Sequence, residues 1–149
     1  MATKYSSLYG QNPSDSTNYI YKGPTPEGVG KLCIRRATFT GTMAAASSDT
    51  LKLFKAVAGE RLVHFANNRS GDPDALNDAT VNIGWTSAPT AVASASTGMQ
   101  AVAKLEFTAG DLVLVAAAAE GDELEVAMAA GAMEVSATHT FVVISHVPA

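Results

Sequence analysis

Cysteine is nearly absent from this sequence of 149 residues, which contains only Cys33. A single thiol cannot form an intramolecular disulfide, and this excludes a disulfide-rich secreted module. We expect Cys33 to be a small buried side chain. Basic residues are also few: the net charge is -4, so the chain lacks the positive field that nucleic-acid binding requires. We therefore expect no direct nucleic-acid partner.

Long apolar runs are missing as well. No run reaches the roughly 20 residues that a membrane-spanning helix needs. Residues 1–7 are polar and lack the apolar stretch of a signal peptide. We expect a protein that is made in the cytoplasm of its host cell, is used in soluble form and has no membrane partner.

Sequence motifs for catalysis are absent too. The chain has no Gly-rich phosphate loop, Gly-x-Ser-x-Gly elbow, Cys-x-x-Cys pair or dinucleotide fingerprint. Three histidines, His64, His139 and His146, are the only candidates for acid–base work at neutral pH, and they share no metal-binding spacing. We predict a protein that is not an enzyme and carries no cofactor. A hydrolase with a site assembled from these histidines and the acidic loops remains an alternative hypothesis.

Two acidic loops are the other candidate sites. Residues 70–78 contain Asp72, Asp74 and Asp78, and could bind calcium if the loop turned its oxygens inward. The EF-hand pattern is absent, however, and Pro and Asp are typical of a solvated turn. We predict no metal site, and the sequence leaves open whether this loop holds an ion. Residues 120–123 similarly indicate a hairpin turn with an acidic rim.

What the chain does contain is enough apolar material for one domain. A chain of this length buries roughly 70% of the surface that its unfolded form exposes. The hydrophobic fraction is 47%, but much of it is alanine, so large core side chains are fewer than this value suggests. We expect a thin core.

Charge and aromatic content divide the chain near residue 36. Up to that point five basic residues face two acidic ones, whereas the rest has five basic and twelve acidic. All four tyrosines lie in the first part, among Gly, Pro, Ser and Asn without regular period. We interpret residues 1–30 as an extended N-terminal arm and residues 31–149 as the body. Tyrosines are common at interfaces, so the predicted partner-binding residues are Tyr5, Tyr9, Tyr19, Tyr21, Lys4 and Lys22.

The body shows short alternating segments separated by turn residues. These segments predict strands at 32–40, in a hairpin over 49–65, and at 79–85, 104–107, 112–115, 123–128 and 140–145, the last buried on both faces. Such spacing is typical of an all-β fold, a β-sandwich or jelly-roll-like barrel. The alanine-rich segments 99–104 and 116–120 also allow one short helix or turn.

Three of these segments carry a resemblance. Residues 49–54, 57–62 and 79–85 resemble the strand, turn and Ile-Gly-Trp succession of the small capsid decoration, or cement, proteins of tailed bacteriophages. The resemblance covers about residues 32 to 146. It implies a homotrimer on the outer surface of the virion capsid, bound to the major capsid protein and fastening adjacent capsomers. The turn proline usual in that family is replaced here by Ala56 to Ala58.

The residues themselves agree with such a structural role. An aromatic, positively charged arm on an acidic body is suited to docking on a partner, where its ordering entropy is offset by binding. The alternative in the recognition class is a carbohydrate- or receptor-binding β module of a phage tail or fibre, with Trp85 as a stacking platform. The two hypotheses place the binding residues in different parts of the chain.

Overall fold

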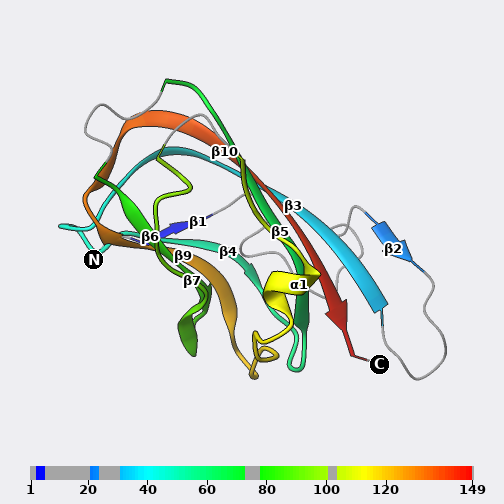
Figure 1. Cartoon of the computed structure of the whole chain (residues 1–149). Coiled ribbons are helices and arrows are strands. Elements are labelled where there is room, and N and C mark those ends of the chain that lie inside the picture. The colour runs from blue at the N-terminus through cyan, green and yellow to red at the C-terminus, as the bar shows by residue number, and fades with distance from the viewer. Residues whose placement is uncertain (1–2, 6–20, 24–30, 73–77, 101–103, 149) are drawn as a thin grey trace.

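The computed structural model describes residues 3–5, 21–23, 31–72, 78–100 and 104–148, and their side chains from Leu32 onward. Within these ranges the chain is a sandwich of two sheets (Figure 1), which confirms the predicted all-β class. The elements are β1 (Thr3–Tyr5), β2 (Tyr21–Gly23), β3 (Lys31–Ala44), β4 (Thr50–Lys55), β5 (Arg61–Ser70), β6 (Thr80–Trp85), β7 (Ala88–Ser96), β8 (Lys104–Phe107), α1 (Ala109–Leu112), β9 (Glu123–Ala130) and β10 (Ala132–Val147).

Each sheet takes five of the described strands. Sheet A has the order β1-β4-β9-β6-β7, and sheet B the order β2-β3-β10-β5-β8. All neighbours are antiparallel except β1, which pairs in parallel with β4. Strands that follow one another in the chain hold the same place in the two orders. This is so for β3 and β4, for β9 and β10, and for β7 and β8, and each of these pairs is joined by a connection between the sheets.

The segment 49–65 is not the predicted hairpin. β4 pairs with β1 and β9, whereas β5 pairs with β10 and β8, so the two strands belong to different sheets. The apolar side chains of both strands face one core from opposite sides, for example Leu53 from sheet A and Phe65 from sheet B. The turn after β4 therefore carries the chain across the sandwich. Alternation identified the strands correctly but could not identify their partners.

The predicted strand at 112–115 is also wrong. Residues 109–112 form the short helix α1, and the side chain of Asp111 accepts hydrogen bonds from the backbone N–H and the hydroxyl of Thr108, at 2.8 Å and 3.1 Å. Leu112 and Val115 are buried. This spacing of three residues is that of a helical turn, whereas a strand would bury every second residue.

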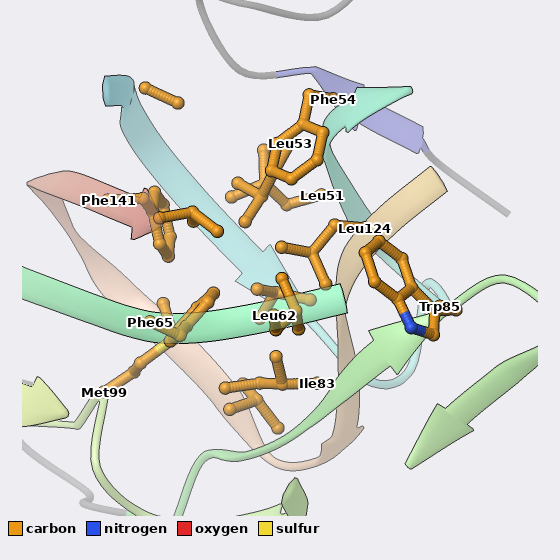
Figure 2. Close-up of a cluster of buried hydrophobic side chains, with 14 of the residues drawn as sticks. Leu51, Leu53, Phe54, Leu62, Phe65, Ile83, Trp85, Met99, Leu124 and Phe141 are labelled. Atoms are coloured by element: carbon orange, nitrogen blue, oxygen red, sulfur yellow. The ribbon is translucent and has the colours of Figure 1, made fainter. Parts of the chain in front are cut away.

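The core lies between the sheets, and several of its large side chains are labelled in Figure 2. Cys33 is 1% exposed, which confirms the prediction that it is buried. Trp85 closes one side of this cluster, and its indole N–H donates to the carbonyl oxygen of Ala116 at 3.0 Å. Phe141 and Val143 on β10 face the core, while Val142 and Ile144 on the other face are half-buried. The prediction of burial on both faces is therefore correct only in part.

β7 forms the exposed edge of sheet A. Residues 79–103 contain no charged side chain, and this strand lies within that stretch. Its pairing with β6 is irregular at two places, it contains Pro89, and Ala95 has a positive φ of 49°. The edge is thus interrupted rather than straight. In the part of the chain that is described, no helix is long and apolar enough to cross a membrane.

Candidate partner-binding surface

The described pieces of the arm lie at the edges of the two sheets. In β1, Lys4 and Tyr5 stand opposite Leu51 and Lys52 of β4. In β2, Tyr21 and Lys22 stand opposite Ile34 and Cys33 of β3. Four of the predicted partner-binding residues are therefore placed by backbone pairing with the chain's own body. Tyr9 and Tyr19 lie outside the described residues.

β1 and β2 are edge strands at the same side of the two sheets. β1 lies next to β4 in sheet A, and β2 lies next to β3 in sheet B. Figure 1 shows them at opposite ends of the sandwich, β1 near one end and β2 near the end where β10 finishes. The two described pieces of the predicted arm therefore lie far apart along the sandwich. The boundary at residue 30 between an arm and a body stays a prediction.

Charged residues on sheet A are paired with one another. The ammonium group of Lys52 lies 2.6 Å from Oε2 of Glu125 and 3.0 Å from Oε2 of Glu123. Burial opposes its charged form, but the hydrogen bonds to Glu125 and then Glu123 outweigh burial and raise the pKa of Lys52 above its ordinary value of 10.5. Lys52 therefore offsets one of the two carboxylates, and the cluster keeps one net negative charge.

A second charged group is buried inside the molecule. The guanidinium of Arg35 forms an ion pair with Glu60 and lies 4.2 Å from the ring centroid of Phe54. The hydroxyl of Ser145 donates to Glu60, which also accepts the backbone N–H of Val57 at 2.9 Å. Arg35 and Glu60 are 1% and 0% exposed. This cluster ties the turn after β4 to β3 and β10, and it is closed to a ligand.

The three histidines do not form one site. His139 is buried between the rings of Phe39 and Phe141, and its Nδ1 lies 3.2 Å from Nδ2 of Asn67. The Nε2 of His64 lies 3.7 Å from Glu106. His146 lines a pocket farther along β10. Among the described residues, no three His, Cys, Asp or Glu side chains are close enough to hold a metal ion together.

The structure bears differently on the two acidic loops. Residues 73–77 lie outside the described residues, and Asp78 accepts the backbone N–H of Ala132 at 3.3 Å. The predicted acidic rim at 120–123 is wrong for Asp122, which is 4% exposed. Its carboxylate accepts hydrogen bonds from Ala119, Thr86 and Ser87, and it ties two turns together.

Trp85 cannot serve as the stacking platform of the alternative hypothesis, because only 1% of the residue is exposed. The short alternating run 79–85 predicted one apolar face correctly, and the indole belongs to that buried face. A sugar would need the flat ring surface in solvent. The ring instead packs against the core shown in Figure 2.

One exposed apolar feature was missed by the sequence. Val113 and Leu114, directly after α1, are 70% and 92% exposed, and they are the exposed large hydrophobic residues in the described part of the chain. Next to them lies a pocket of about 300 Å³ whose lining residues are Arg61, Leu62, Val63, Leu112, Val113, Val115 and His146. The misassigned strand at 112–115 concealed this pair, since a strand of the sandwich would have buried one of the two.

Comparison with known proteins supports the fold. No protein-family model and no curated protein matches the sequence. Among solved structures, a chain of the capsid of Ralstonia phage GP4 is similar with a TM-score of 0.63 and 18% identity, over 99% of each chain. A chain of the capsid asymmetric unit of cyanophage Pam1 is similar with a TM-score of 0.54 and 20% identity, over 93% of this chain and 100% of that one. At these identities the similarity is one of fold.

Proposed function

We propose that this chain is a virion structural protein that binds the outside of a phage capsid and stabilises it by fastening adjacent capsomers. The observation that carries the proposal is the fold similarity to chains from two phage capsid structures. The similarity covers 93% or more of this chain and 99% or more of each of the other two. A fold alone does not fix a function. The decoration-protein resemblance of residues 49–62 and 79–85 supports this particular role.

The proposed partner is the major capsid protein, and the proposed assembly is a homotrimer on the capsid surface. A sandwich with many small side chains buries limited apolar area by itself, so subunit contacts add burial that the single chain lacks. The proposal assigns the main contact to the arm, with Tyr5, Tyr9, Tyr19, Tyr21, Lys4 and Lys22. That the chain is not an enzyme and has no cofactor stays part of the proposal.

Co-sedimentation with empty phage heads that lack this protein tests the proposal. The full chain should pellet with the heads and saturate at a fixed number of copies. A full-length variant with Tyr9→Ser and Tyr19→Ser should bind roughly tenfold more weakly, because buried tyrosines are common binding hot spots. A variant with Thr90→Ala and Ser94→Ala on exposed β7 is the matched control and should bind like the wild type.

The mass of the purified chain in solution tests the assembly. A homotrimer has three times the chain mass of 15.3 kDa. Wild-type protein that stays in the supernatant at every concentration would refute the capsid role. Full binding by the double tyrosine variant would instead leave the capsid role standing and remove these arm residues from the contact.

A further inference from the structure

The pocket beside α1 lies between an apolar wall and two nitrogen-bearing side chains. Val63, Leu112, Val113 and Val115 form much of the lining, and Leu114 stands 92% exposed next to it. Exposure of a large apolar side chain to water is unfavourable, so a partner that covers Leu114 gains free energy of binding. The polar part of the lining consists of Arg61 and His146.

These two polar side chains lack partners among the described residues. Nε2 of His146 is buried without a hydrogen-bond partner, and Arg61 is exposed and forms no ion pair with a described residue. A buried nitrogen without a partner is unfavourable, and the guanidinium of Arg61 can only donate. The pocket therefore gains from a ligand that supplies an acceptor to Arg61 and, in the tautomer with the proton on Nε2, to His146 as well. None of the described residues that line the pocket is a carboxylate that could supply one.

Strand register places the two nitrogens side by side. His146 of β10 stands opposite Arg61 of β5 and opposite Leu32 of β3. In the next row, Ile144 stands between Ile34 and His64. The face of sheet B that is turned away from the core therefore has apolar side chains toward β3 and nitrogen-bearing ones toward β5. In the row beyond, exposed Arg36 on β3 and exposed Glu106 on β8 flank Val142 and Ala66, so that row carries charges of both signs.

We propose that this pocket, with Arg61, His146 and the exposed Val113–Leu114 pair, binds a segment of the capsid protein that presents a carboxylate beside an apolar side chain. The identity of the partner rests on the proposed function. Arg61 and His146 donate hydrogen bonds to the carboxylate, and the apolar side chain covers Val63 and Leu114. A charged hydrogen bond with an apolar contact beside it is a common form of binding hot spot.

A symmetric contact between two copies is a poorer occupant for this surface. A twofold contact brings the same patch of each copy together, so Arg61 would approach Arg61 of the other chain. Like charges at such a contact oppose association. A partner with an acidic group complements the positive charge of Arg61, and this charge favours such a partner over a second copy of the chain.

Binding to empty phage heads tests the surface with single substitutions. Arg61→Glu should weaken binding roughly tenfold or more, since it places a carboxylate against a carboxylate. Leu114→Ser should weaken it by about fivefold through lost apolar contact. Lys55→Glu makes the same charge change at an exposed residue at the end of β4 in the other sheet, and it should leave binding within about twofold.

A small probe tests the chemistry of the pocket without any shell. The full chain is titrated with 4-methylpentanoate and, in parallel, with the uncharged 4-methylpentanamide, while NMR signals of the His146 ring and of the Val63, Val113 and Leu114 methyl groups are followed. The acid should shift these signals, and the amide should need roughly tenfold more for the same shift. Arg61→Gln should reduce the difference between the two probes.

Each outcome decides a separate point. Equal shifts with acid and amide, or none, would overturn the carboxylate assignment. If Arg61→Glu and Leu114→Ser each bind heads as tightly as the wild type, this surface is not the binding site. The proposed function would then stand without it. A change in oligomer mass on Leu114→Ser would assign the surface to contacts between copies and would overturn the capsid segment as occupant. Failure of the wild type on heads concerns the proposed function alone, since the probe titration stands apart from it.

Discussion

Two buried carboxylates, Glu60 and Asp122, hold the turns at one end of the sandwich together. The turn after β4 and the loop before β9 are joined by backbone hydrogen bonds from Ala56 N to Asp122 O at 2.9 Å and from Gly59 N to Ala118 O at 2.8 Å. A third hydrogen bond runs in the opposite direction, from the backbone N–H of Ala118 to the backbone carbonyl of Glu60 at 2.8 Å. The side chains of the two acids then fix the same turns from inside.

We expect Asp122→Ala to lower the free energy of unfolding by roughly 3 kcal/mol, because the change leaves the donors of Ala119, Thr86 and Ser87 without their charged acceptor. Denaturation with urea measures the change. Asp111→Ala at the start of α1 is the matched control. Asp111 is exposed and holds only the helix start, so its loss should lower stability by about 1 kcal/mol or less. Equal losses for the two variants would contradict this assignment.

Stability should also fall in acid through Asp122. Burial opposes the charged carboxylate, but hydrogen bonds from Ala119, Ser87 and Thr86 outweigh it and lower the pKa of Asp122 below its ordinary value of 3.8. The stabilisation is therefore complete above about pH 5, declines below the unfolded-state pKa, and is lost as the pH falls through the lower, folded-state pKa. Asp122→Asn, which does not titrate, should show a shallower loss from pH 5 to pH 2 in urea denaturation. Parallel curves would contradict this.

Arg35 and Glu60 should behave as a coupled pair. Arg35→Met alone should destabilise the fold by roughly 3 to 5 kcal/mol, because it leaves the buried Glu60 charge uncompensated. Adding Glu60→Leu should recover part of this loss, since the buried charge is then gone. A double-mutant cycle by urea denaturation measures the coupling. Additive losses would contradict a direct interaction.

At the scale of the element, strands were predictable where one face is apolar and the other polar. The runs at 79–85 and 123–128 alternate, and β6 and β9 follow them. Pairing was not predictable, because alternation is the same whether two strands join in a hairpin or lie in opposite sheets. The helix α1 escaped prediction because Leu112–Val115 is continuous and apolar, and such a run has no period of its own.

Gly84 lets β7 come close to β6. A Cβ on this residue would lie 2.2 Å from the carbonyl oxygen of Ala88, which is backbone and cannot turn aside. Gly84→Ala should therefore destabilise the fold by roughly 2 kcal/mol or more. Gly110→Ala in α1 is the control, since its nearest neighbour is 3.9 Å away and alanine favours a helix. Urea denaturation that gave both variants wild-type stability would contradict the close approach.

For the whole molecule, the described core belongs to the body. Among the side chains described from Leu32 onward, the buried hydrophobic residues lie between Cys33 and Val143. Deleting residues 1–30 removes β1 and β2, which are edge strands of three residues each. We expect the shortened chain to unfold cooperatively and to lose binding to empty heads. Unchanged binding by the shortened chain would show that the body alone makes the contact.

The candidate surface was predictable only in part. Tyrosines in a segment without regular period are visible in the sequence, so the arm residues could be proposed directly. Arg61 and His146 stand 85 positions apart and meet only through the register of β5 and β10. Leu114 is one apolar residue among many until the structure shows that it faces solvent. A site assembled across strands leaves no local signal in the sequence.

The interrupted edge at β7 bears on how the protein behaves when it is concentrated. A straight, uncharged edge strand is a template on which further chains can add, as in amyloid fibrils. Pro89 offers no N–H to an incoming strand, and Ala95 with its positive φ bends the edge out of register. We therefore expect backbone geometry to oppose fibril growth from this edge, in a stretch where no charged side chain is available to do so.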